Sequence, residues 1–348
     1  MMKKVFYIYF LVLITIQACQ KEVAIVPDGY NTGAVREKPT TPYVSDRNFK
    51  VVAYYAEGRE PDSIELAKFK MITHLHFAFA YPNANGTLKA IARPANFEKM
   101  KKLAKENGVK FGVSIAGVSA AEKQIYENIV KDPALRSVFI KNIVDFAVVN
   151  DLDGIDIDWE YPTADKGQHI TYESFMRELS TELHAWHKYL SAAVTAGVFP
   201  GGIRDGITLG AVEAMDFINL MAYDGAGYKG NPNHASLVLT EDVINYWLNQ
   251  KGIPKEKAVV GIPAYGKNAA NAALTFRDLI RLGADPDANS FTNSDGITYY
   301  YNGIPTVKQK AQMAKNNANG IMFWEFYQDI NGDKSLLKAA NDAIGRTY

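Results

Sequence analysis

The chain has 348 residues, and its 38 basic and 38 acidic side chains give it no formal net charge. This length allows one large domain or two ordinary ones, with enough chain to bury a large core. Because the sequence contains no basic run, its charge argues against nucleic acid as a main partner.

The first 18 residues have the pattern of a signal peptide. Lys3 and Lys4 precede an apolar run over 6–16, which is too short to span a bilayer. The run is followed by Ala18 and Cys19, which resemble the processing site of a bacterial lipoprotein. We therefore expect an exported protein, lipidated at Cys19 and anchored to the outer membrane or cell surface of a Gram-negative bacterium. An ordinary signal peptide with an incidental cysteine is the alternative.

Cys19 is the only cysteine, so intrachain disulfides are excluded. Residues 19–48 are rich in proline, threonine and charged residues and show no periodicity, which predicts a flexible tether. The lipid at Cys19 would be the only contact with a membrane. We expect the tethered protein to be a monomer.

From residue 49 to residue 348, short apolar runs alternate with helical patterns, which is typical of a parallel α/β fold. The predicted strands are Val51–Ala56, Ile72–Ala80, Lys110–Ala116, Gly154–Glu160, Leu190–Ala196, Phe217–Tyr223, Ala258–Pro263 and Gly320–Phe326. The predicted helices are Asn96–Asn107, Pro133–Asn150, Tyr172–Tyr189, Thr240–Lys251, Ala273–Gly283 and Thr306–Asn317. Eight such units predict a (β/α)8 TIM barrel over residues 49–348. A doubly wound sheet fits less well, because no glycine-rich turn follows the first strand.

The run 153–162 alternates apolar and acidic residues with the period of a strand. One face would carry three apolar side chains: Ile155, Ile157 and Trp159. The other face would carry three acids: Asp156, Asp158 and Glu160. Pro162 ends the strand, so Glu160 should lie at its C-terminal tip. Three stacked carboxylates do not suit an ordinary core and indicate catalysis.

Other predicted strands also carry polar or aromatic residues near their C-terminal ends, where a barrel assembles its active site. They are Tyr54, Ser114, Asn219, Met221, Tyr223, Asp224, Tyr265, Trp324 and Glu325.

The acidic strand matches the Asp-x-x-Asp-x-Asp-x-Glu signature of family 18 glycoside hydrolases, the chitinases and endo-β-N-acetylglucosaminidases. Segments along the whole predicted barrel also resemble this family: Val51–Tyr55, Thr73–Phe79, Ser114–Gly117, Met221–Asp224, Gly261–Gly266 and Gly320–Glu325. Ala116 replaces the first glycine of the family's Ser-x-Gly-Gly element. The segment Lys267–Asn319 resembles members without the large insertion domain after strand seven, which predicts an open groove and endo-type cleavage.

Glu160 is the candidate acid and base, because hydrolysis needs a carboxyl that holds its proton until the leaving oxygen takes it. Asp158 would lie about 7 Å away along the strand, close enough for the two charges to interact. Asp156 would add to this repulsion and could share a proton with Asp158. By resemblance to the family, the reaction is substrate-assisted, and Asp158 orients the attacking 2-acetamido group. Tyr223 then hydrogen-bonds the acetamido oxygen, and Trp324 forms the floor of the −1 sugar site.

The resemblance implies retaining endo-hydrolysis of GlcNAc-β-1,4-GlcNAc linkages in chitin or chitooligosaccharides. The residues expected to contact this substrate are Tyr54, Phe79, Ser114, Met221, Asp224, Tyr265 and Trp324. One alternative is an endo-β-N-acetylglucosaminidase, because the chitobiose core of N-glycans contains the same linkage. Another is a non-catalytic carbohydrate-binding lipoprotein, against which the retained Glu160 and Asp158 argue.

No cofactor or metal is expected. Acids on one strand could bind Mg²⁺ or Ca²⁺, but no further ligand recurs at a suitable spacing. Asp329–Asp333 lacks the glycine and final acid of a calcium loop and predicts a turn between a strand and a helix. His74 and His76 are interpreted as core residues, and Asp153 as structural.

Overall fold

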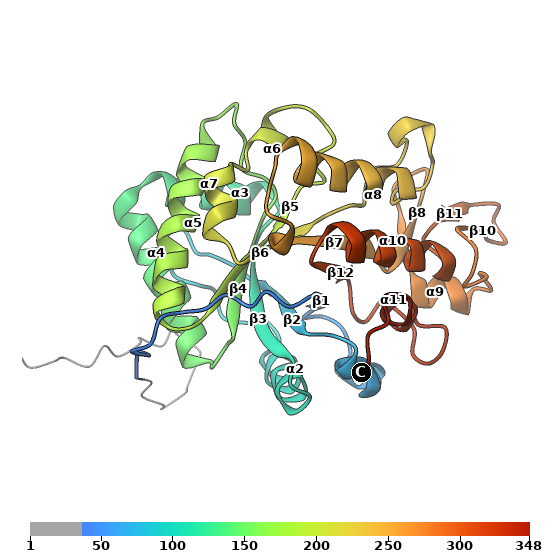
Figure 1. Cartoon of the computed structure of the whole chain (residues 1–348), viewed down its shortest axis with the longest axis horizontal. Helices are drawn as coiled ribbons and strands as arrows, with labels where there is room; N and C mark the ends of the chain where they lie inside the picture. The colour runs from blue at the N-terminus through green and yellow to red at the C-terminus, as the bar shows by residue number, and fades with distance from the viewer. Residues whose placement is uncertain (1–36) are drawn as a thin grey trace, which may run out of the picture.

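The structure is a computed structural model that describes residues 37–348 (Figure 1). The predicted signal peptide, Cys19 and most of the predicted tether lie outside the described residues. Within residues 37–348, no helix has the length and apolar character needed to cross a bilayer.

Eight parallel strands close into a barrel in the order β1-β12-β7-β6-β5-β4-β3-β2, which confirms the predicted fold. Their bounds are β1 Lys50–Ala56, β2 His74–Ala80, β3 Lys110–Gly117, β4 Gly154–Trp159, β5 Tyr189–Val194, β6 Phe217–Leu220, β7 Ala258–Pro263 and β12 Gly320–Trp324. The strand β6 is shorter than predicted, so Met221 to Asp224 follow it outside the strand. All eight predicted strands are present at the expected places.

Helices surround this barrel (Figure 1). They are α1 Ala67–Lys70, α2 Pro94–Glu106, α3 Ala120–Lys131, α4 Pro133–Val149, α5 Gln168–Ala185, α6 Gly202–Asp205, α7 Leu209–Ala214, α8 Leu237–Ile244, α9 Phe276–Arg281, α10 Ile304–Asn317 and α11 Leu336–Ile344. A π-helical turn over Asn245–Gln250 continues α8. Asp132 begins α4 by accepting hydrogen bonds from two first-turn amides, at Ala134 and Leu135.

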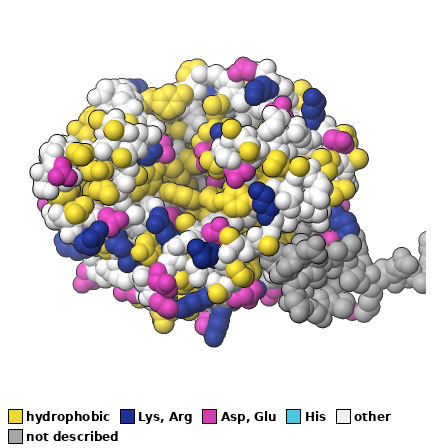
Figure 2. All heavy atoms as spheres, turned by 180° about the vertical axis from the view of Figure 1, so that it is seen from behind, with side chains coloured by type: hydrophobic (Ala, Val, Ile, Leu, Met, Phe, Trp, Pro, Cys, Tyr) yellow, Lys and Arg dark blue, Asp and Glu magenta, His cyan; other side chains and the backbone are white. Residues whose placement is uncertain are grey.

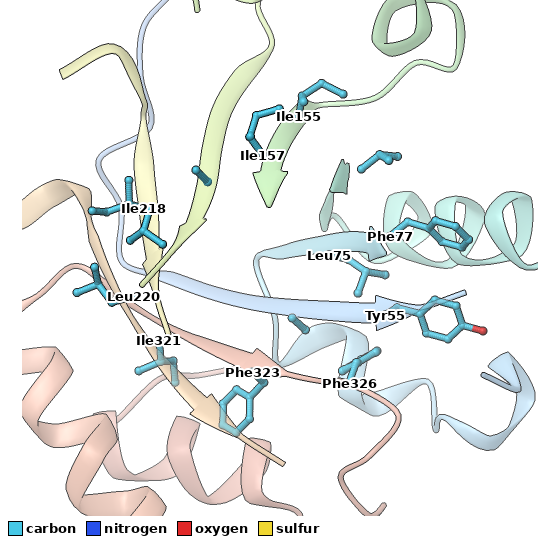
Figure 3. Close-up of a cluster of buried hydrophobic side chains, with 14 of the residues drawn as sticks. Tyr55, Leu75, Phe77, Ile155, Ile157, Ile218, Leu220, Ile321, Phe323 and Phe326 are labelled. Atoms are coloured by element: carbon cyan, nitrogen blue, oxygen red, sulfur yellow. The ribbon is translucent and has the colours of Figure 1, made fainter. Parts of the chain in front are cut away.

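The alternation of the strands separates two apolar layers. Side chains on the outer face of the barrel pack against the helices, including Ile155 and Ile157 of β4, which are fully buried. Figure 3 shows this layer, with labelled side chains such as Leu75, Phe77, Leu220 and Phe323 projecting from their strands. A second, smaller layer fills the barrel interior. The outer layer leaves the inner face of β4 free to carry its three acids.

A small antiparallel sheet follows the seventh barrel strand, in the order β10-β11-β8-β9. Its strands are β8 Tyr265–Asn268, β9 Ala273–Thr275, β10 Ser290–Thr292 and β11 Thr298–Tyr300. The prediction of a helix over 273–283 is therefore wrong at its start. Ala273 and Leu274 pair with β8, and α9 begins only after Thr275, whose hydroxyl accepts a hydrogen bond from Asp278 N at 2.9 Å. The sheet is far smaller than a separate insertion domain, as predicted.

The last part of the predicted tether lies against the barrel, so the prediction of a flexible segment is wrong for residues 41–48. The Tyr43 ring stacks on His184 with centroids 4.1 Å apart, and its hydroxyl donates to Asp216 Oδ1 at 3.0 Å. Asp46 forms an ion pair with Lys110 at 2.8 Å. These partners lie at or near the N-terminal ends of barrel strands. The segment therefore covers the end of the barrel opposite to the acidic strand tip.

We predict that Tyr43→Ala releases this segment. The substitution removes the stacking on His184 and leaves the buried Asp216 carboxylate without one donor, which should cost about 1–3 kcal/mol of folding free energy. Limited proteolysis should then cut within residues 37–48 faster than in the wild type. The neighbouring Val44→Ala is the control, because Val44 is 83% exposed. Equal cleavage rates in the two variants would contradict the docking of this segment through Tyr43.

Candidate active site

Asp156 lies at the centre of the barrel. The register of β4 with its neighbours β3 and β5 places a serine hydroxyl on either side of it. Ser114 of β3 and Ser191 of β5 are its direct neighbours on either side. Their hydroxyls donate to Asp156 at 2.8 and 2.6 Å, Tyr54 donates at 2.8 Å and Asn219 Nδ2 at 3.3 Å. An ionised carboxylate only accepts hydrogen bonds, and these four donors match that requirement. The fully buried Asp156 is therefore a satisfied charge.

Asp158 lies one step closer to the strand tip on the same face, beside Ala116. Its side chain is 3% exposed, and its Oδ1 has no hydrogen-bond partner among the described residues. Burial raises the pKa of Asp158 well above its usual range, and the nearby charges of Glu160 and Asp156 and a hydrogen bond to Glu160 raise it further. Asp158 therefore keeps its proton to higher pH than a free aspartate does.

Glu160 follows the last residue of β4 and lies at the mouth of the barrel. Burial raises the pKa of its carboxyl, while a hydrogen bond from Tyr161 and the charge of Lys123 offset part of this effect. The result is a carboxyl that keeps its proton to higher pH than a free glutamate does. Such a group suits the role of general acid.

Aromatic side chains surround Asp158 and Glu160. Trp324 stacks on Phe79 with centroids 5.6 Å apart and an interplanar angle of 22°, and Tyr54 lies 5.6 Å from Trp324. Burial raises the pKa of Tyr223 well above its usual range, and the charges of Asp158 and Glu160 add to this. Tyr223 therefore remains a hydrogen-bond donor beside the acids.

Asp224 supplies a fixed negative charge at the edge of the site. Its Oδ1 accepts a hydrogen bond from Tyr265 Oη at 2.7 Å, and it lies 2.8 Å from Lys267 Nζ and 3.2 Å from His234 Nδ1. Burial alone would raise the pKa of Asp224, but hydrogen bonds from His234, Lys267 and Tyr265 lower it to about 2. Sequence reasoning missed His234 and Lys267, because they lie in segments after β6 and β7 that have no recognisable spacing.

A cavity of 770 Å³ opens above these groups. Nine of the predicted site residues line it: Tyr54, Phe79, Asp158, Glu160, Met221, Tyr223, Asp224, Tyr265 and Trp324. Ser114 does not, which corrects the prediction that it contacts substrate. Its side chain is fully buried and donates to Asp156 below the cavity floor. Asp156 also lies below the floor, so it acts on the site only through its charge and its neighbours.

The cavity continues into a groove whose rim includes exposed apolar side chains. Val118 is 40% exposed, Phe199 from the loop after β5 is 53% exposed, and Ile203 of α6 is 46% exposed. The space-filling view shows a hollow across one face of the molecule, lined largely by hydrophobic side chains with acidic ones beside it (Figure 2). Sequence reasoning missed this rim, because loop residues without a motif carry no signal of their position.

Three other polar residues of the strands have structural roles. The His74 and His76 side chains are buried, with His76 Nε2 lying 3.1 Å from Tyr189 Oη. Glu325 lies outside the cavity, fully buried, and pairs with Arg59 at 2.9 Å.

The profile of the family described as "Glycosyl hydrolases family 18" matches residues 50–329. The chain belongs to this family. It is 30% identical to the GH18 chitinase ChiB from the chitin utilization locus of Flavobacterium johnsoniae, with a TM-score of 0.73 over 86% of this chain and 94% of that one.

Two sequence relatives have chitinase names. The chain is 34% identical to a chitinase-like effector of Moniliophthora roreri, over 62% of this chain and 57% of the relative. It is 31% identical to a probable endochitinase of Caenorhabditis elegans, over 67% of this chain and 42% of the relative. The family 18 chain thus spans about half the length of these curated relatives.

We predict that Asp158→Asn stabilises this family 18 barrel at neutral pH. Because the folded pKa of Asp158 is raised, its contribution to stability is fully present below the ordinary value of 3.8 and is lost as the pH rises through the folded pKa. Asparagine has no proton to lose, so the variant should be more stable by about 0.5–2 kcal/mol at neutral pH, as is common when a functional group is removed from a strained site. The measurement is chemical denaturation across pH.

The comparison variant is Asp224→Asn. The pKa of Asp224 is lowered, so its stabilising contribution is present at neutral pH and this substitution should destabilise the protein there. A destabilised Asp158→Asn variant at neutral pH would show that Asp158 is charged in the folded protein.

Proposed function

We propose that this protein is a retaining endo-hydrolase of GlcNAc-β-1,4-GlcNAc linkages that uses the substrate's own 2-acetamido group as nucleophile. The observation that carries this proposal is that Asp158 and Glu160 lie two residues apart at the C-terminal end of β4 and line the same cavity. Enzymes with two opposing carboxylates hold them about 5–9 Å apart, on opposite faces of the sugar ring. Two carboxyls at alternate positions of one strand end project to the same side of the cavity and cannot flank a ring in this way.

The raised pKa values of Asp158 and Glu160 support a substrate-assisted reaction, for which family 18 is a recognised exception to the two-carboxylate scheme. Glu160 at the cavity mouth would give its proton to the leaving glycosidic oxygen. The acetamido oxygen would attack the anomeric carbon from the opposite face, forming a cyclic oxazolinium and a C–O bond as the glycosidic bond breaks. Glu160, then a carboxylate, would take a proton from the water that opens this intermediate.

Asp158 and Tyr223 would direct the acetamido group. A carboxyl of raised pKa that shares a hydrogen bond with Glu160 can turn its free oxygen to the acetamido N–H. The phenol of Tyr223 can donate to the acetamido oxygen, because it stays protonated. Negative charge on Asp156, below the floor, would stabilise the positive charge that develops on the sugar.

The substrate is expected to lie in an open groove. The aromatic floor of Trp324, Phe79 and Tyr54 suits the apolar face of a −1 sugar. The small sheet β8–β11 takes the place of a wall-forming domain, so an internal part of a chain could enter from the side. This favours endo-cleavage of chitin or chitooligosaccharides. Export and a lipid anchor at Cys19 remain part of this proposal.

The test compares the wild type with Glu160→Gln on chitotetraose and on a high-mannose glycoprotein, with products identified by mass spectrometry. The wild type should produce chitobiose, and the variant should be slower by about 100- to 10,000-fold, the range for loss of a general acid. Glu182→Gln is the control, because Glu182 is an exposed residue on the outer helix α5.

The substrates separate the alternatives. Release of a glycan bearing one GlcNAc, without cleavage of chitotetraose, would assign the protein to the endo-β-N-acetylglucosaminidases. Binding of chitotetraose without any cleavage by the wild type would contradict the hydrolase and leave a carbohydrate-binding protein.

A further inference from the structure

We propose that a second cavity, outside the active groove, binds a neutral oligosaccharide. This cavity of 470 Å³ lies among the N-terminal ends of α8 and α10 and the hairpin of β10 and β11 (Figure 1). Its volume falls within the range of about 300–1,000 Å³ that is usual for small-molecule sites. None of its lining residues lines the active-site cavity. The choice of ligand class rests on the proposed function, whereas the site itself rests on the lining chemistry.

The lining of the second cavity is uncharged and combines polar with apolar side chains. None of the described residues that line it carries a charge, although 22% of the chain is charged. Instead the cavity is lined by amides, hydroxyls, the half-buried ring of Tyr300 and the apolar side chains of Pro232, Leu237 and Val238. Neutral donors and acceptors around an aromatic ring match the hydroxyls and the apolar face of a neutral sugar. A charged ligand would find no counter-charge there.

Two asparagine side chains in the second cavity have Nδ2 groups that can donate to a ligand. Asn231 Oδ1 accepts a hydrogen bond from Asn233 N at 2.9 Å, and Asn289 Oδ1 accepts from Gly303 N and Thr306 Oγ1 at 3.0 and 2.7 Å. Both side chains are thus fixed through their oxygens. Their Nδ2 groups have no acceptor among the described residues and remain available as donors.

Asn302 supplies a complementary acceptor. It lines the cavity and is only 1% exposed, yet its Oδ1 has no hydrogen-bond partner among the described residues. Its Nδ2 donates to Ala235 O at 2.9 Å, which fixes the side chain. A buried acceptor without a partner costs about 1–3 kcal/mol, so such atoms occur mainly where a ligand or water supplies the donor. A sugar hydroxyl is such a donor.

The second cavity shares a wall with the active site. The loop 231–236 lines the second cavity through Asn231 and Asn233, while His234, the residue after Asn233, contacts Asp224 of the active site. On the neighbouring sheet, Tyr300 pairs with Lys267, which forms the ion pair with Asp224. A polymer held at Tyr300 would therefore keep further segments at high effective concentration beside the groove. The site should matter for polymeric substrate and not for short oligomers.

The experiment measures retention on chitin beads and kcat/KM for chitotetraose in the wild type and in Tyr300→Ala. Retention is measured in the Glu160→Gln background, so that the beads are not degraded. Tyr300→Ala should weaken retention by at least about fivefold, the factor that about 1 kcal/mol represents. Its kcat/KM for chitotetraose should stay within about twofold of the wild-type value. Tyr348→Ala is the matched control, because Tyr348 is an exposed tyrosine on the C-terminal segment.

Equal retention of the Tyr300→Ala and Tyr348→Ala variants would overturn the second site while leaving the hydrolase intact. A parallel loss of retention and of chitotetraose hydrolysis would also overturn it, because it would place the effect of Tyr300 in the groove. Failure of the wild type to cleave chitotetraose would instead overturn the proposed reaction. Retention that still depended on Tyr300 would then support the second site alone.

Discussion

The barrel is organised by the need to bury three carboxylates on one strand without burying three charges. An isolated buried charge is costly, and like charges on alternate residues repel each other. The three carboxyl groups differ in how the cost of their burial is offset. Asp156 receives four donors, from β1, β3, β5 and β6, so its charge is satisfied. Asp158 receives no such set, and burial beside Glu160 and Asp156 raises the pKa of its carboxyl well above the usual range.

This unequal arrangement depends on closure of the barrel. Ser114 and Ser191 face Asp156 because they share its register on both neighbouring strands. Tyr54 and Asn219 reach the same carboxylate from strands that only closure brings to the opposite side, and Asn219 also donates to Tyr54 Oη at 2.9 Å. The apolar outer faces of the same strands hold the barrel against its helices. The chemistry of the inner face and the stability of the outer face are therefore properties of one alternating sequence.

The parts of this arrangement that repeat along the chain could be predicted from the sequence. The period of two in Ile155–Glu160 is enough to place the acids on one face, and eight such strands indicate a barrel. The contacts that depend on strand register could not be predicted, because the sequence of one strand does not show which residues of the neighbouring strands lie beside it. The sequence therefore predicts that Ser114 contacts substrate in the groove, although its hydroxyl donates a hydrogen bond to Asp156 instead. Tyr43 likewise lies in a segment without periodicity, and only its contacts with His184 and Asp216 show that it is docked.

The measurement that tests the central claim most directly is carboxyl ¹³C NMR of protein labelled in its aspartate and glutamate side chains. At neutral pH, we expect one protonated aspartate carboxyl in the wild type, and its signal should disappear in Asp158→Asn. Ionisation of every aspartate at neutral pH, or a protonated signal that persists in Asp158→Asn, would contradict the assignment of the proton to Asp158.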